Sequence, residues 1–191
     1  MKKWSLTVIA FGALLMFAAC GGGKAPDQLN YKVGPFRFTD QGGGQMALED
    51  LNGKVWVAHF IFTHCTTVCP GLTSNMSQLQ KKLKEQGAKA EIVTFSVDPE
   101  RDSPEALKAY LSKFQADFTN WHALTGYSFE DIRKFAGQSF KIAVEKDTSS
   151  DQVIHGTSFY LVNRAGTVVA RYDGEEPPYD QIVKDVLALN K

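Results

Sequence analysis

Two cysteines stand where an apolar, strand-forming run gives way to a helical pattern, and this junction constrains the fold more than any other feature of the chain. The run extends from Val55 to Phe62, and Cys65 and Cys69 follow it. Apolar residues then recur at helical spacing as far as Gly87. Pro70 suits a first helical turn, because its missing N–H would be unpaired there and its ring presets the backbone angle. The pattern predicts a strand, a short loop carrying two thiols, and a helix.

The position of the two thiols predicts reactive sulfur. Free N–H groups and the positive end of the helix dipole favour a thiolate at Cys69, so we expect its pKa to lie below the value of about 8.5 for a free thiol. A thiolate is both a nucleophile and a metal ligand. The pair therefore indicates either reversible disulfide chemistry or the binding of a soft metal. Two buried cysteines with a purely structural role are the alternative, which a helix N-terminus followed by proline disfavours.

The first twenty residues have the layout of a secretory signal. Lys2 and Lys3 precede an apolar run from Leu6 to Ala19, which is shorter than the ~20 residues of a spanning helix. The small residues just before Cys20 resemble a bacterial lipobox, which implies lipidation of that cysteine. Phe17 departs from the leucine usual at its position, so an uncleaved anchor remains the alternative.

These features predict three parts of the chain. Residues 1–19 form a signal peptide of the lipoprotein type, residues 20–30 form a lipidated flexible tether that contains three consecutive glycines, and residues 31–191 form one domain. The folded domain is then expected on the extracytoplasmic face of the bacterial cell membrane, held there by its lipid anchor.

Charge and compartment narrow the possible functions. Without the signal peptide the chain has 19 basic and 21 acidic residues, a net charge of −2, so nothing favours nucleic acid as a partner. In an oxidising compartment the two remaining thiols would normally close into a disulfide. If they work as thiols, an extracytoplasmic thiol reductant has to keep them reduced.

The order of elements predicts an α/β fold. Two strands joined by a helix imply a parallel, right-handed crossover, and a terminal strand pair implies an antiparallel hairpin. The order is that of a thioredoxin-like fold with an N-terminal β-hairpin extension and a central mixed sheet flanked by helices. The segments, after the strand and helix already described, are a hairpin of 31–40 and 45–50, a strand at 91–97, a helix from 102 with a capping box, a strand at 121–124, a helix from 128, a hairpin of 158–162 and 167–171, and a helix at 178–189.

Three motifs of the domain resemble the Sco/SenC family of copper-binding, cytochrome oxidase assembly proteins. They are Cys65-Thr-Thr-Val-Cys69-Pro70, Phe95-Ser-Val-Asp-Pro-Glu-Arg-Asp102 and His155-Gly-Thr-Ser-Phe-Tyr-Leu-Val162. They occur in the family's order and spacing, and the resemblance runs from about Tyr31 to Leu189. Together the motifs are highly specific, although each alone would be weak.

The resemblance implies a copper site formed by Cys65, Cys69 and His155. It also marks Asp98 as functionally important, in metal transfer or in partner docking. From the residues alone, Asp98 and Asp102 are equally compatible with capping the turn and the helix around Pro99, and for Asp102 capping is the preferred interpretation. The remaining histidines, His59, His64 and His122, lack support from motif spacing and are left out of the ligand set.

The proposed donors fit copper. Soft sulfur holds Cu(I), and an added imidazole makes Cu(II) acceptable. Zinc binds the same donor types, but structural zinc usually has four protein ligands. Oxidation to a Cys65–Cys69 disulfide would remove both anionic ligands, so metal binding and thiol redox state are coupled.

We consider three functions, and the family resemblance implies the oxidase-related role of the first two. The first is a copper metallochaperone that receives the ion from an upstream copper donor and assists assembly of the dinuclear copper centre in the copper-accepting subunit of cytochrome c oxidase. The second is a thiol-disulfide reductase that keeps the cysteines of that subunit reduced. Against general oxidoreductase work, residues 154–159 lack the cis-proline typical of thioredoxins. A peroxidase would use Cys69, but Phe62 stands where peroxiredoxins have proline.

Overall fold

The computed structural model describes residues 29–191. The predicted signal peptide, Cys20 and all but the last two residues of the predicted tether lie outside the described residues. Among residues 29–191, no helix combines the length and the apolar composition needed to span a membrane.

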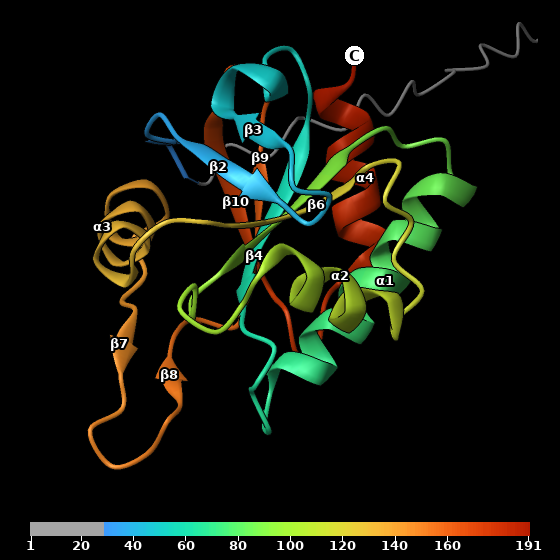
Figure 1. The fold of residues 1–191 in the computed structure, drawn as a ribbon. Helices are drawn as coiled ribbons and strands as arrows, with labels where there is room; N and C mark the ends of the chain where they lie inside the picture. The colour runs from blue at the N-terminus through green and yellow to red at the C-terminus, as the bar shows by residue number, and fades with distance from the viewer. Residues whose placement is uncertain (1–28) are drawn as a thin grey trace, which may run out of the picture.

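One eight-stranded mixed sheet organises the fold, in the order β1-β10-β9-β4-β5-β6-β2-β3, and a separate two-stranded sheet pairs β7 with β8 (Figure 1). The strands are β1 (Tyr31–Lys32), β2 (Arg37–Asp40), β3 (Gln45–Ala47), β4 (Trp56–Ile61), β5 (Glu91–Ser96), β6 (Trp121–Thr125), β7 (Glu145–Lys146), β8 (Val153–Ile154), β9 (Ser158–Val162) and β10 (Thr167–Asp173). The helices are α1 (Cys69–Glu85), α2 (Pro104–Ser112), α3 (Phe129–Phe140) and α4 (Tyr179–Leu189), with a short 3-10 helix at Leu48–Leu51.

The centre of the sheet confirms the predicted thioredoxin-like arrangement. Strands β4, β5 and β6 are parallel, and β9 runs antiparallel to β4 on its other side. Every residue of β4 is buried, as a strand covered on both faces requires. Figure 1 shows α1, α2 and α4 on one side of the sheet and α3 on the other. The connections from β4 through α1 to β5 and from β5 through α2 to β6 are parallel crossovers that advance in the same direction, so right-handedness puts α1 and α2 on the same face.

The predicted N-terminal hairpin exists, but it is shorter than expected and is part of the main sheet. Strands β2 and β3 pair, and β2 also pairs with β6, so the hairpin extends one edge. Residues 31–32 instead pair with β10 at the opposite edge. Pro35 separates the two segments, because proline has no N–H to donate to a strand ladder.

Phenylalanine side chains form a large part of the core. Phe60, Phe95, Phe135 and Phe140 pack together, with ring centroids 5.1–6.0 Å apart, between the sheet and α3. Phe36 and the partly buried Phe38 add their rings to this cluster. Such edge and stacked contacts contribute about 0.5–1.5 kcal/mol each beyond area burial. This cluster holds α3 against the strands that carry the site.

Gly174, which follows β10, packs closely against the segment between His155 and β9. A Cβ atom built at Gly174 would lie 2.9 Å from both Leu72 of α1 and Phe159 of β9, and closer still to the backbone oxygen of Thr157. Only glycine fits this position without a shift of the backbone.

We therefore expect Gly174→Ala to lower the free energy of unfolding by about 1–3 kcal/mol, the usual cost of overpacking. Gly71→Ala is the matched control, because a Cβ atom at Gly71 of α1 meets nothing within 4 Å. That change should leave stability unchanged or raise it by up to about 1 kcal/mol. Urea unfolding of both variants measures the difference, and equal stabilities would contradict this account of the packing.

Candidate metal centre

The loop between β4 and α1, residues 62–68, carries Cys65 and leads into Cys69 at the N-terminus of α1. We call it the cysteine loop. The helix begins at Cys69, and Val68 at the cap position provides no side-chain hydrogen bond. The Cys69 N–H donates instead to the Cys65 sulfur at 3.3 Å. Both cysteines are free and buried. The helix start therefore brings the Cys65 sulfur to a backbone N–H that would otherwise be unpaired.

His155 comes to the thiols from a different part of the chain. It follows β8, and its Nε2 lies 3.6 Å from the Cys69 sulfur, across 86 residues of sequence. Its Nδ1 lies 2.9 Å from the Gly156 carbonyl oxygen. A carbonyl only accepts, so Nδ1 carries the proton and Nε2 presents its lone pair to the sulfur. A hydrogen bond from the ring nitrogen that does not bind the metal is the usual way in which proteins orient a metal-binding imidazole.

The two thiols differ in acidity, and the difference reverses the sequence-based expectation. Burial, the largest influence on Cys65, opposes ionisation, but hydrogen bonds from Cys69 and Thr67 outweigh it and lower the pKa of Cys65. For Cys69, burial and the neighbouring Cys65 raise the pKa well above that of a free thiol. The prediction of a low pKa at Cys69 is wrong, because the loss of hydration at a fully buried sulfur exceeds the effect of the helix dipole.

Cys69 lies at the centre of the predicted donor set. It lies in contact with Cys65 on one side and with His155 on the other. Within residues 29–191, no three His, Cys, Asp or Glu side chains already stand close enough together to hold a metal ion. The donors fit a soft cation by their chemistry, and a bound ion would have to draw them closer.

Asp98 and Asp102 lie on the turn that follows β5. The Asp98 carboxylate pairs with Arg101, and its N–H donates to Ser96. The backbone oxygen of Asp98 accepts from the N–H groups of Arg101 and Asp102, which closes the turn. Neither aspartate forms a hydrogen bond or an ion pair with Cys65, Cys69 or His155.

Asp102 does not cap α2, which corrects the preferred interpretation of this residue. Ser103 is the N-cap, and its side chain accepts from the Ala106 N–H. The fully buried Asp102 carboxylate instead accepts hydrogen bonds from the Thr63 hydroxyl and the Ser96 hydroxyl, each at 2.6 Å. Burial raises the pKa of Asp102 despite these bonds. Sequence reasoning missed this anchor of the cysteine loop, and its signal was a second aspartate close behind a buried strand.

The three remaining histidines have partners other than the two thiols. His59 is buried in β4, where Nε2 contacts the Thr94 hydroxyl at 2.6 Å, and burial lowers its pKa to about 3. His122 contacts Glu91. His64 is half exposed and contacts Thr63.

Known proteins resemble this chain along most of its length. The SCO1/SenC family model matches residues 24–190. The chain belongs to the SCO1/SenC family. A SCO1 protein homolog of Bacillus subtilis is 50% identical over 173 residues, which cover 90% of each chain.

Solved structures of Sco proteins have the same fold. A SCO1/SenC family lipoprotein from Bacillus anthracis matches with a TM-score of 0.83 at 49% identity, over 85% of this chain and 97% of that one. BsSco, a member of the Sco family of cytochrome c oxidase assembly proteins in which a disulfide switch was identified, matches with a TM-score of 0.82 at 48% identity, over 88% and 98%. ScoI of Bradyrhizobium japonicum with copper bound matches with a TM-score of 0.69 at 28% identity, over 83% and 99%.

The contrast between the thiols predicts their order of alkylation. In the reduced, metal-free protein, iodoacetamide should modify Cys65 at least about tenfold faster than Cys69, because Cys65 has the lower pKa and the more accessible sulfur. Because the pKa of Cys65 is lowered in the folded state, its alkylation should reach half of its maximal rate at a lower pH than the alkylation of a free thiol does. Timed quenching and fragment-ion mapping measure both rates, and faster modification of Cys69 would contradict the assignment.

Proposed function

We propose that this protein is a membrane-anchored copper metallochaperone that binds one copper ion through Cys65, Cys69 and His155. Its role is to assist assembly of the dinuclear copper centre of cytochrome c oxidase. The observation that carries the proposal is the 3.6 Å contact between the Cys69 sulfur and the free lone pair of His155 Nε2. Two segments that are 86 residues apart are brought together there, which surface packing alone does not require.

Copper is the cargo that fits these donors. Two sulfurs favour Cu(I), and the imidazole extends the site to Cu(II), while hard ions such as Mg²⁺ and Ca²⁺ prefer oxygen. The copper-bound ScoI structure and the membership of BsSco in a family of oxidase assembly proteins support the same cargo and the same assembly role. An upstream copper donor and the copper-accepting oxidase subunit are the partners that this role requires.

The redox state of the thiols would control copper binding. Closing the Cys65–Cys69 disulfide releases two electrons and two protons from the dithiol, and the disulfide sulfurs are no longer anionic ligands. An extracytoplasmic thiol reductant would restore the binding form.

A second candidate function uses the same pair as a reductant. The lowered pKa of Cys65 favours attack on a disulfide, and BsSco was found to contain a disulfide switch. The protein would then be a thiol-disulfide reductase that keeps the oxidase subunit's cysteines reduced. His155 has no required role in that exchange, so the histidine distinguishes the two functions.

We infer an extracytoplasmic, lipid-anchored location from the N-terminal segment. Residues 1–19 would be removed as a signal peptide, Cys20 would receive the lipid, and residues 20–30 would tether the domain of residues 31–191. The related Bacillus anthracis protein is a lipoprotein, which supports this arrangement.

The decisive variant is His155→Ala in the reduced protein. Loss of the only nitrogen donor should weaken Cu(II) binding by more than about 100-fold, since even changes beside a ligand commonly cost 10- to 100-fold. Titration with Cu(II), followed by the thiolate-to-copper absorption band, measures the affinity. The matched control is His64→Ala, which removes a half-exposed histidine of the cysteine loop itself and should bind copper as the unmodified protein does.

The same variants separate the two functions in cells. If the protein delivers copper, cells with His155→Ala should assemble little active cytochrome c oxidase, and cells with His64→Ala should assemble normal amounts. Full oxidase activity with His155→Ala would overturn the metallochaperone proposal in favour of the reductase.

A further inference from the structure

His155 is delivered by a hairpin that does not belong to the main sheet. Strands β7 and β8 pair only with each other within the described residues, through Glu145–Ile154 and Lys146–Val153. Figure 1 shows the hairpin extending beyond the sheet on the side of α3. Two-stranded hairpins of this size are marginal in water when nothing else supports them. The position of His155 therefore depends on how this hairpin is held.

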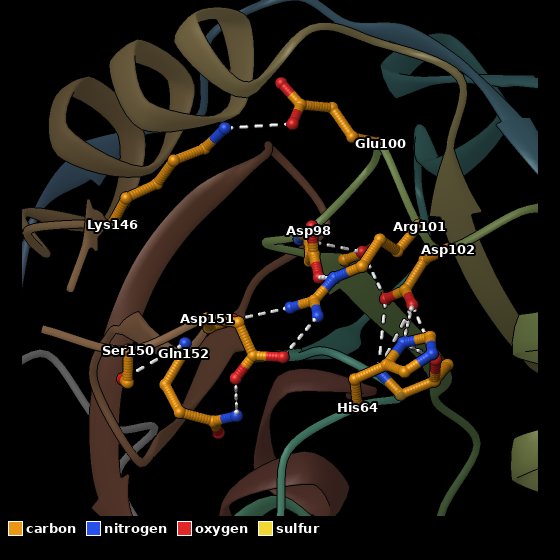
Figure 2. A network of polar contacts seen from close by, with 11 residues as sticks. His64, Asp98, Glu100, Arg101, Asp102, Lys146, Ser150, Asp151 and Gln152 are labelled. Atoms are coloured by element: carbon orange, nitrogen blue, oxygen red, sulfur yellow. Dashed lines mark hydrogen bonds and ion pairs between the residues drawn. The ribbon is translucent and has the colours of Figure 1, made fainter. Parts of the chain in front are cut away.

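Arg101 makes two polar contacts with the hairpin loop. Its Nη1 lies 2.9 Å from the Asp151 carboxylate, and its Nη2 donates to the Asp151 backbone oxygen at 2.6 Å. Figure 2 shows the guanidinium lying between the turn after β5 and the hairpin loop. Asp151 is only four residues before His155, and Val153 between them is buried in the core.

A second, weaker contact lies beside the first. Lys146 of β7 pairs with Glu100 at 2.9 Å, and its ammonium group lies 4.9 Å from the centre of the Phe129 ring. Both members of this ion pair are more than half exposed. Exposed pairs of this type contribute little, and the Asp151 carboxylate is itself 73% exposed, so the bond from Arg101 to the Asp151 backbone oxygen is the main polar contact.

Arg101 is itself held in place by a second carboxylate, that of Asp98. Its Nε donates to the Asp98 carboxylate, which is almost completely buried, so the guanidinium is bound on both sides. The same turn carries Asp102, which binds Thr63 of the cysteine loop. One five-residue turn, residues 98–102, thus contacts both segments that carry the sulfur and nitrogen donors.

We propose that Arg101 is a positioning residue for His155. Its bonds to Asp98 and Asp151 keep the hairpin on the turn after β5 and thereby keep Nε2 beside the Cys69 sulfur. The consequence for bound copper rests on the function proposed above, whereas the effect on the hairpin does not. A charge-assisted fork of this kind holds orientation as well as distance, which lysine at the same position would not reproduce.

The test compares Arg101→Ala with Arg133→Ala in the full-length protein. Arg133 is the matched control because it also forms an arginine–carboxylate pair three residues apart, with Glu130 on the surface of α3, away from the thiols. We expect Arg101→Ala to speed transfer of Cu(I) to a chelator by roughly three- to tenfold, and Arg133→Ala to leave it unchanged. Arg101→Lys should recover only part of the loss. Equal rates for the two alanine variants would overturn the proposal.

A double-mutant cycle with His155→Ala shows whether Arg101 acts through the histidine. The two thiols still hold Cu(I) without the imidazole, so the transfer rate remains measurable. If Arg101 positions His155, then Arg101→Ala should have no further effect in the His155→Ala background. The same fold-change in both backgrounds would mean a general structural role and would overturn the proposal.

Hydrogen exchange tests the hairpin without copper. Arg101→Ala should speed amide exchange in residues 145–155 and leave β4 and β5 unchanged, and unchanged exchange in the hairpin would overturn the proposal. If the unmodified protein bound no copper, the proposed function would fail, and the exchange result alone would still decide the role of Arg101.

Discussion

The pairing of β4 with a parallel strand on one side and an antiparallel strand on the other is the constraint on which the site depends. Because β5 is parallel to β4, the carboxyl ends of both strands lie at the same end of the sheet. Because β9 is antiparallel to β4, its first residues reach that same end. The cysteine loop follows β4, the turn of residues 98–102 follows β5, and His155 precedes β9. A shift of this pairing would separate the sulfur donors from the nitrogen donor.

Differences in burial and hydrogen bonding then give the groups at that end of the sheet different pKa values. Burial opposes ionisation of Cys65, but hydrogen bonds from Cys69 and Thr67 outweigh it and lower its pKa, while burial raises the pKa of Cys69 and keeps that thiol protonated in the absence of a metal. Burial also lowers the pKa of His155, which keeps the imidazole neutral and its Nε2 lone pair available. A soft cation would compensate for the burial of these groups, because metal binding replaces the proton on sulfur. Copper loading and proton release are therefore expected to be linked.

Much of the fold could be predicted from local patterns, and the failures have physical reasons. The buried runs of β4 and β5, the α3 start at Ser128 and the β9–β10 hairpin each have a strong periodic or turn signal. The β7–β8 hairpin gives no sequence signal, because two-residue strands have no periodicity and the hairpin is held by contacts such as Arg101 with Asp151. The sequence predicts the N-terminal hairpin only as an extension, because it does not show which sheet edge an exposed strand will join.

The sequence by itself determined which donor chemistry this protein carries and where the strand-to-helix junction presents it. Two thiols beside a proline-led helix are a local feature, and so is a histidine just ahead of a hairpin strand. Only the tertiary structure decided that Cys65 is the acidic thiol, that Asp102 anchors the cysteine loop, and that Arg101 holds the hairpin of His155. Each of these depends on burial and on contacts between segments tens of residues apart, and a linear pattern contains neither quantity.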